Sequence, residues 1–306
     1  TITYFINVYD IEMLKYAKKL KVSSKNPNLS HEHISYSKAK LMGVNIKLNS
    51  LGHRNKELSK IKNKNNYRIH VIGSSMSLGW GVKSEKTFSA ILEKKLNSNQ
   101  YIKDKYGDLI VINAGIGNTN TKHHYYLFKD QYKLTSPDTL ILQYFINDAE
   151  IIKKEKNNFI LKKSYSAAFL YQQILSLSFL GSLDNYYDEL YSDNSIGWTN
   201  VKNSILKLKK LTEDNNINFM IMIIPDLHNL SNDNELIKLY TKIDKEFTEM
   251  EIPVFNTYKS LSDNFRSKPM ESWVSKTDPH PNAKAHKIIG NDLYNFMLKH
   301  KVFLFK

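Results

Sequence analysis

The sequence predicts an α/β protein in which helices cover both faces of a parallel sheet. Short apolar runs that read as buried strands alternate along the chain with longer amphipathic helical patterns. The chain has 306 residues, of which 41% are hydrophobic, and this is enough to bury a large core. A repeated β-α order favours parallel strands, because each helix returns the chain to the same edge of the sheet.

Five strands are expected. The first contains Ile69, Val71 and Ile72 and is broken by Gly73. The other strands are predicted at 109–113, 139–146, 219–225 and 252–255. Helical patterns follow at 87–96, 121–134, 198–211, 235–250 and 285–296. Because these helices separate the strands, every strand should end at one common edge.

Residues 1–66 are expected to form an N-terminal arm and linker, and residues 67–306 the main domain. Within the arm, residues 11–21 have a helical apolar pattern, 22–50 look irregular, and 41–48 suggest one small strand. His31 and His33 have no third ligand nearby in the sequence, so a surface role is favoured over a metal site. The arm should pack on the main domain as an extended segment.

Residues 149–196 interrupt the alternation and are expected to form a helical insertion. Apolar residues such as Phe169 and Leu170 are followed by Tyr186, Tyr187 and Tyr191. Two interpretations stay open. The insertion contains a core helix, or residues 164–191 form a lid that covers a site and stacks on sugar rings.

Composition and charge exclude several kinds of protein. The chain has no cysteine, which excludes disulfides and thiolate metal sites. The net charge is +14, and residues 1–66 hold 13 Lys/Arg against 4 Asp/Glu. No basic stripe with interleaved stacking aromatics appears, so nucleic-acid binding is not expected. A basic N-terminal face near an anionic membrane or an acidic polymer is favoured.

No run of 18 or more apolar residues appears in the sequence, so no membrane-spanning segment is expected within it. The first residue is Thr1, without a methionine. Two explanations stay open: a processed segment that preceded Thr1, such as a signal or an anchor near a membrane, or a boundary of the sequence as given. The sequence carries no expectation about the oligomeric state.

Polar residues at the strand ends form a candidate catalytic set. Ser75 follows the first strand, Gly115 the second and Asn147 the third, while Asp278 and His280 precede the last helix. These ends converge on one crevice in such a sheet. Ser75 would be the nucleophile, His280 its base and Asp278 the group that orients the base. The backbone N–H groups of Ser75 and Gly115, with the Asn147 amide, would form an oxyanion hole. This chemistry requires neither metal nor cofactor, and none is expected.

The same four blocks resemble the SGNH (GDSL-type) hydrolase family. They stand as Gly73-Ser74-Ser75, Asn113-Ala114-Gly115, Ile146-Asn147-Asp148 and Asp278-Pro279-His280-Pro281, in the family's order over about residues 67–300. The resemblance implies a flavodoxin-like three-layer α/β/α fold with a five-stranded parallel sheet. It also implies ester chemistry on an acyl group.

The chain departs from the family pattern at three positions. Ser74 replaces the usual aspartate before the nucleophile, and altered local hydrogen bonding is expected there. Phe145 stands where a glycine is common and could narrow the acyl pocket. One residue separates Asp278 from His280 instead of the usual two, a spacing that also occurs in the family. Asp226 and His228 have the same spacing, and they are expected at the rim as substrate-binding residues.

The arm also resembles the segment that precedes the hydrolase domain in anchored bacterial members of the family, through residues 49–52 and Arg54. Such members often belong to cell-envelope polysaccharide pathways, which implies an extracytoplasmic location. Three functions stay open. The first is an esterase that removes acyl groups, in the first place acetyl, from a carbohydrate or another ester. The second is an O-acyltransferase with the same triad that acts on a cell-surface polysaccharide, and the third is a non-catalytic carbohydrate-binding relative.

Overall fold

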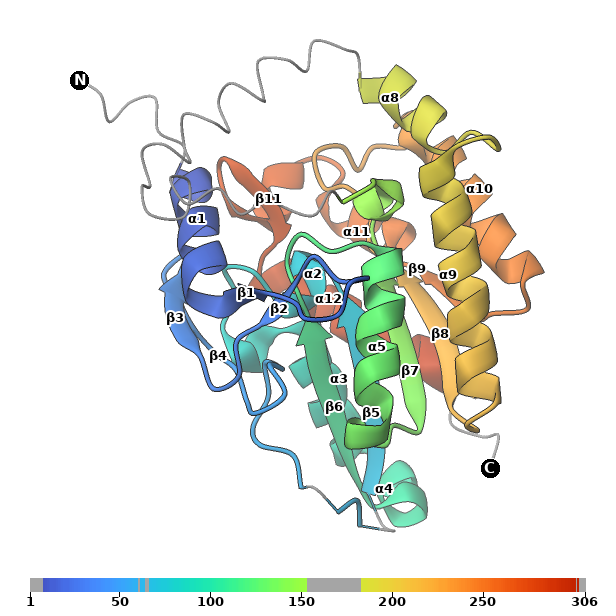
Figure 1. Cartoon of the computed structure of the whole chain (residues 1–306). Coiled ribbons are helices and arrows are strands. Elements are labelled where there is room, and N and C mark those ends of the chain that lie inside the picture. The colour runs from blue at the N-terminus through green and yellow to red at the C-terminus, as the bar shows by residue number, and fades with distance from the viewer. Residues whose placement is uncertain (1–7, 60, 64–65, 153–182, 301, 303–306) are drawn as a thin grey trace.

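The computed structural model describes residues 8–59, 61–63, 66–152, 183–300 and 302, and shows a parallel sheet between two helical layers (Figure 1). The sheet has the strand order β6-β5-β7-β8-β9, and all neighbouring strands pair in parallel. The strands are β5 (Asn66–Gly73), β6 (Asp108–Gly115), β7 (Thr139–Tyr144), β8 (Asn218–Ile223) and β9 (Val254–Asn256). This is the flavodoxin-like order. The predicted fold class is confirmed.

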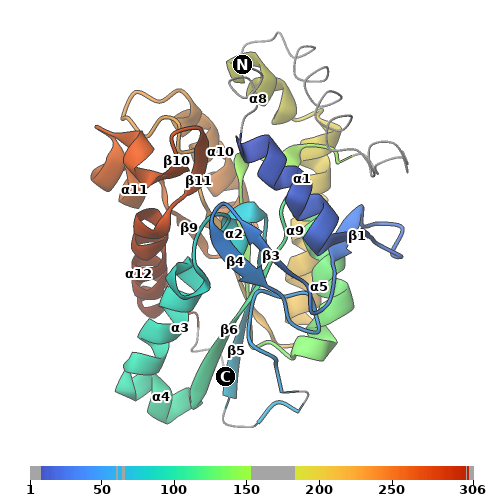
Figure 2. The ribbon, with the colours of Figure 1, turned by 90° about the vertical axis from the view of Figure 1, so that its left-hand side faces the viewer.

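Each face of the sheet has its own core. Figure 2 shows α3 (Phe88–Ser98) and α12 (Ala283–Lys299) on one side of the sheet, and α5 (Thr121–Thr135) and α9 (Ile196–Glu213) on the other. Because side chains alternate along a strand, Val71 packs in the α3/α12 core while Ile72 packs in the α5/α9 core. The predicted helices are therefore present, with ends shifted by a few residues.

The remaining elements complete the two layers and the arm. They are α1 (Val8–Leu20), β1 (Lys21–Ser23), β2 (His31–His33), β3 (Lys38–Leu41), β4 (Val44–Lys47), α2 (Ser75–Leu78), η2 (Ser84–Lys86), α4 (Gln100–Tyr106), η3 (Ile146–Ala149), α8 (Leu183–Leu190), α10 (Leu236–Glu249), α11 (Tyr258–Phe265), η4 (Pro269–Ser272), β10 (Trp273–Ser275) and β11 (Asp278–Pro281). The single strand predicted at 41–48 was wrong. Met42 and Gly43 have φ values of 46° and 77° and form the turn of the β3–β4 hairpin.

The arm covers an exposed edge of the sheet. β6 is an edge strand. The Arg54 N–H donates to the Asn113 carbonyl at 2.9 Å, and the Asn55 side chain donates to the Val111 carbonyl at 2.9 Å. These bonds satisfy backbone groups that an open edge would expose to water or to another chain. Arm residues thus complete the sheet of the main domain.

The surface role predicted for His31 and His33 was wrong. The His31 Nε2–H donates to the Gly117 carbonyl at 3.0 Å. His33 is buried, donates from Nδ1 to the Gly52 carbonyl at 2.8 Å and accepts the Tyr16 hydroxyl at Nε2 at 2.7 Å. The sequence pattern missed this because the arm folds back onto the loop after β6, which the local sequence does not show.

Burial lowers the pKa of the arm histidines, to about 3 for His33 and to about 4 for His53. The folded protein therefore keeps them neutral at a pH where the unfolded chain, with histidine pKa values near 6.5, binds protons. Stability should fall as the pH drops from about 6.5 toward 4, by roughly 1.4 kcal/mol per pH unit for each such histidine.

Thermal unfolding followed between pH 7.5 and 4.5 would check this prediction. His53→Gln removes one of the buried groups and should flatten the slope of Tm against pH. His300→Gln removes an exposed histidine and should leave the slope unchanged. A Tm that is constant across this range would contradict the prediction.

Candidate active site

Ser75, His280 and Asp278 form one hydrogen-bonded chain. Ser75 is the first residue of α2, and His280 and Asp278 lie on β11. The Ser75 hydroxyl lies 2.8 Å from His280 Nε2, and His280 Nδ1 lies 2.6 Å from Asp278 Oδ1. The structure thus brings together all three residues that the sequence proposed as nucleophile, base and orienting group, in the geometry that such roles require.

The Asp278 carboxylate is buried but well supplied with donors. Besides His280, it accepts a hydrogen bond from Trp80 Nε1 at 2.8 Å. Burial by itself would raise the pKa of Asp278, but the hydrogen bonds and charge of His280, together with Trp80, lower that pKa below its ordinary value. An ionised Asp278 holds the proton on His280 Nδ1, so Nε2 accepts the Ser75 hydroxyl. Sequence reasoning missed Trp80.

The short Asp278–His280 spacing follows from the local strand. β11 pairs antiparallel with β10. Side chains two residues apart on a strand point to the same side. Asp278 and His280 therefore share one face, and their side chains meet directly. On a strand, a single intervening residue is therefore enough to bring the Asp278 and His280 side chains into contact.

Arg54 fixes the turn that follows the candidate nucleophile. It is buried, and its guanidinium donates to the carbonyls of Leu78, Gly79 and Val82 at 2.8, 2.7 and 2.6 Å. Burial lowers the pKa of Arg54 to about 10, so it stays charged at neutral pH. Gly79 ends α2 in the left-handed region, and a Cβ there would lie 2.5 Å from Thr87. An arm residue thereby positions α2.

Ser74 is directed away from the candidate base. Its hydroxyl caps α2 by accepting the Met76 N–H at 3.4 Å, and its own N–H donates to Gln143 Oε1 at 3.1 Å. Ser77 also donates to Gln143 Oε1, at 3.2 Å. Gln143 and the cap thus account for the hydrogen bonding around Ser74, and its expected difference from a relative with aspartate at this position stays a prediction.

Gly115 has a packing role in this structure. A Cβ at this position would lie 2.3 Å from the Leu78 nitrogen, so a larger residue would push α2 off β6. The Gly115 N–H points to Asn113 Oδ1 at 3.2 Å. This N–H therefore already has an acceptor, and its predicted role in the oxyanion hole stays a prediction.

Asn147 lies on η3, exposed, at the end of β7. Its Oδ1 accepts the hydroxyl of Tyr187 on α8 at 2.8 Å. Among the described residues, no acceptor is found for the Asn147 Nδ2. The Tyr187 contact orients the amide with its oxygen bound and its NH₂ group available to a ligand. Tyr187 is a residue of the site that no short motif marked.

The described end of the predicted lid has two different roles. Residues 164–182 lie outside the described residues. Tyr187 contacts Asn147, and the Tyr186 hydroxyl donates to Glu150 Oε1 at 2.9 Å. Tyr191 is buried and its hydroxyl donates to the Ile146 carbonyl at 2.6 Å. The expected sugar-stacking role of Tyr191 was wrong, because this ring belongs to the core.

The three predicted substrate residues lie in two places. Phe145 is half-buried before η3, where it packs against both cores. Asp226 and His228 form a pair with Oδ1 and Nδ1 2.8 Å apart, and this hydrogen bond raises the pKa of His228. The His228 ring meets Trp273 of β10 edge-on at 5.2 Å. The pair therefore lies beside the hairpin that carries His280.

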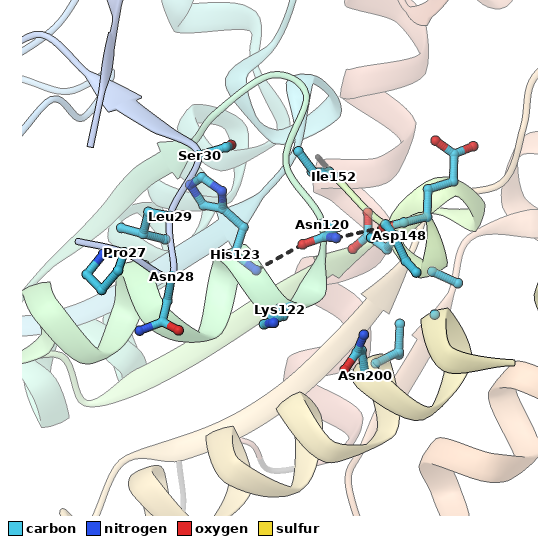
Figure 3. A pocket seen from close by; sticks show the side chains of 15 residues that line it. Pro27, Asn28, Leu29, Ser30, Asn120, Lys122, His123, Asp148, Ile152 and Asn200 are labelled. Carbon is cyan, nitrogen blue, oxygen red and sulfur yellow. Dashed lines mark hydrogen bonds between the residues drawn. The ribbon is translucent and has the colours of Figure 1, made fainter. Parts of the chain in front are cut away.

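A separate cavity of about 180 Å³ adjoins the turn that carries Asn147 (Figure 3). The arm, the start of α5, η3 and the start of α9 line it. Asn120 joins two of these parts, accepting the His123 N–H at 3.0 Å and donating to the Glu150 carbonyl at 2.7 Å. The Ser75–His280–Asp278 chain does not line this cavity, so it is distinct from the candidate catalytic site.

Two further findings concern only the described part of the chain. It contains no group of three or more His, Asp or Glu side chains placed to hold a metal ion. None of its helices is both long enough and apolar enough to cross a membrane.

Comparison with known proteins finds likeness at the level of structure alone. No family model and no curated protein matches the sequence. Similar solved structures include a protein assigned to the G-D-S-L lipolytic family from Desulfitobacterium hafniense, with 15% identity and a TM-score of 0.47 over 76% of this chain and 99% of that one. A mutant of an acetylxylan esterase from Geobacillus stearothermophilus has 13% identity and a TM-score of 0.48, over 78% of this chain and 96% of that one. An esterase from Pseudoalteromonas sp. has 14% identity and a TM-score of 0.44, over 76% of this chain and 98% of that one.

These structural neighbours are GDSL/SGNH hydrolases and esterases. At such identities and TM-scores, the likeness carries no argument about the reaction.

Arg54→Lys should impair the site. Lysine keeps the charge but cannot reach three carbonyls with one planar group, so a buried acceptor is left unpaired at a cost of about 1–3 kcal/mol. We expect a lower Tm and a lower kcat toward an aryl ester, with a smaller change in KM, because Ser75 loses its fixed position. Arg266→Lys on the exposed surface is the matched control. Wild-type Tm and kcat in Arg54→Lys would contradict the role given to Arg54.

Proposed function

We propose that this protein is a serine esterase of the SGNH type that removes acyl groups, in the first place acetyl, from a carbohydrate or another ester. The observation that carries the proposal is the hydrogen-bonded chain Ser75–His280–Asp278, with distances of 2.8 and 2.6 Å. A hydroxyl, an imidazole and a carboxylate in this order make a general-base-activated nucleophile. Ser75 is half-buried and lies two residues after the end of β5.

In the proposed reaction, Ser75 Oγ attacks the ester carbonyl while its proton passes to His280 Nε2. Asp278 stabilises the imidazolium that forms. The tetrahedral intermediate collapses, and His280 returns the proton to the departing alkoxide. Water then attacks the acyl-enzyme with His280 again as base, which releases the carboxylic acid and restores the Ser75 hydroxyl.

We assign the stabilisation of the oxyanion to two donors. The Ser75 N–H is at the start of α2 and has no acceptor among the described residues. The Asn147 NH₂ group is oriented by Tyr187, which binds the amide oxygen. Donors that are held in place before the reaction lower the barrier because no reorganisation is needed when charge develops. The proposal assigns the oxyanion to these two groups, with Gly115 as a third only if its bond to Asn113 opens.

The carbohydrate substrate is proposed from the rim of the site. Trp273 belongs to β10, and His228 and Asp226 lie beside it, so this region offers an indole ring, an imidazole and a carboxylate. Aromatic faces and polar hydrogen-bonding groups are the usual partners of a sugar. Phe145 is proposed to narrow the acyl pocket, which would favour a small acyl group.

An extracytoplasmic location near a bacterial membrane is proposed on the resemblance of the arm to anchored relatives. An acyltransferase that passes the acyl group to a sugar hydroxyl uses the same residues, and a carbohydrate-binding relative would use only the rim. Measuring both released acid and glycan mass separates these outcomes. Free acid with loss of acyl mass indicates an esterase, whereas gain of acyl mass on a glycan indicates a transferase.

Ser75→Ala should abolish hydrolysis of p-nitrophenyl acetate and labelling by a fluorophosphonate. Ser74→Ala should retain most activity, because the Ser74 hydroxyl only caps α2 and contacts Gln143. Mass spectrometry of the labelled protein identifies the modified serine. A fluorophosphonate adduct on Ser74 would be inconsistent with the assignment.

Asn147→Ala should lower kcat by about 10²–10³ with little change in KM, since an oxyanion donor acts on the transition state. Tyr187→Phe keeps the ring but removes the bond to Asn147 Oδ1, and should lower kcat by a smaller factor, about threefold to tenfold. Steady-state kinetics on an aryl ester gives both parameters. A change in KM alone would instead make Asn147 a substrate-binding residue.

A further inference from the structure

A groove of about 780 Å³ lies between α3 and α12, which run side by side on one face of the sheet (Figure 2). Ile91 and Tyr294 contribute apolar surface to it. Asn99 Nδ2 donates to the Tyr294 hydroxyl at 2.8 Å, and Lys95 Nζ lies 5.1 Å from the centre of that ring. The groove is thus an ordered surface in which an aromatic ring is held between an amide and a cation.

The charge of this groove is strongly one-sided. Five lysines and a single carboxylate, that of Glu85, line it; the lysines are Lys86, Lys94, Lys95, Lys284 and Lys287. In the described part of the chain, none of these five forms an ion pair. Exposed lysines on other helices do form ion pairs: Lys210 of α9 pairs with Asp214, directly after that helix, and Lys245 pairs with Glu249 on α10.

On α3, the lysines lack an acidic partner for a structural reason. Glu93 is the only acidic residue of this helix, and its carboxylate accepts the Val111 N–H at 2.7 Å. It is therefore directed to the edge of the sheet, away from Lys94 and Lys95. The lysines concentrate positive potential in a concave surface, which raises the local concentration of an anionic ligand.

The shape of the groove fits an extended chain. The helices approach closely at Gly290, where a Cβ would lie 2.9 Å from the Ile91 Cβ. From Lys284 to Tyr294 the groove follows ten residues of α12, about 15 Å along the helix axis. A flat lipid surface would contact the outer lysines and leave the inner Ile91 and Tyr294 uncovered. A polymer strand can contact both.

We propose that the α3–α12 groove binds an anionic polysaccharide, with the lysines paired to its carboxylate groups and Tyr294, Asn99 and Asn291 in contact with its sugar rings. The groove begins at Ala283, three residues after His280, so a bound chain continues toward the β10–β11 hairpin. Presentation of an ester of this chain to Ser75 rests on the proposed function, whereas the binding itself does not.

The binding test uses the full chain with Ser75→Ala, so that no turnover interferes, and follows its electrophoretic mobility in gels that contain polygalacturonate or neutral dextran. Polygalacturonate should retard the protein and dextran should not. Added salt should weaken the retardation, because exposed charges are screened. Equal behaviour in the two gels would overturn the proposal.

Paired variants locate the binding surface. Lys94→Gln with Lys287→Gln changes the two walls of the groove and should weaken polygalacturonate binding about fivefold. Lys210→Gln with Lys245→Gln removes the same charge from the opposite helical layer and should leave binding nearly unchanged. An equal loss in both pairs would show a non-specific charge effect and would overturn the groove assignment. Groove-dependent binding of duplex DNA or phosphatidylserine vesicles as tight as that of polygalacturonate would overturn the polysaccharide assignment.

The two proposals can fail separately. With Ser75 intact, the groove variant should hydrolyse p-nitrophenyl acetate at the unchanged rate, because Lys94 and Lys287 take no part in the catalytic chain. If the native protein hydrolyses the ester normally but does not bind polygalacturonate, only the groove proposal is rejected. Groove-dependent binding without any hydrolysis would support the groove and reject the esterase.

Discussion

The contact between Arg54 and the turn after α2 is the constraint on which the candidate site depends. α2 has only four residues, so its own hydrogen bonds cannot hold it in one orientation. The guanidinium of Arg54 binds the carbonyl of the last residue of the helix and two carbonyls that follow it, and Gly115 lets the helix lie directly on β6. Ser75 is the first residue of that helix. Its position relative to His280 is therefore set by an arginine of the arm and a glycine of the neighbouring strand.

This constraint explains why the arm is part of the site. The same segment that supplies Arg54 also covers the β6 edge through Asn55, and it is anchored further by His33 and Tyr16. Tyr16 in turn accepts the Gly117 N–H at 2.7 Å in the loop after β6. The buried polar atoms of Tyr16 and His33 are thus paired with each other, with Gly52 and with the loop after β6, where unpaired groups would be costly.

The candidate catalytic chain and the basic groove meet at one element. β11 carries Asp278 and His280, and α12 begins directly after it and forms one wall of the groove. The Asp278 carboxylate depends on Trp80, which belongs to the turn held by Arg54. Arg54, the turn that it holds and β11 are therefore linked through Trp80, Asp278 and His280 to Ser75, so a change in any of these three parts is expected to alter the position of Ser75.

The sequence by itself determined the fold class and proposed the candidate catalytic set, because apolar periodicity and residue type are local properties. Alternating strand and helix patterns were enough to predict the parallel sheet, and the residues after Gly73 and around His280 were enough to propose a serine, a histidine and an aspartate. Only the tertiary structure decided the roles of Arg54, Trp80 and Tyr187, the burial of His33, and the engagement of the Gly115 N–H by Asn113. Each of these depends on contacts between segments far apart in the chain, and no local pattern of hydrophobicity or spacing specifies such a contact.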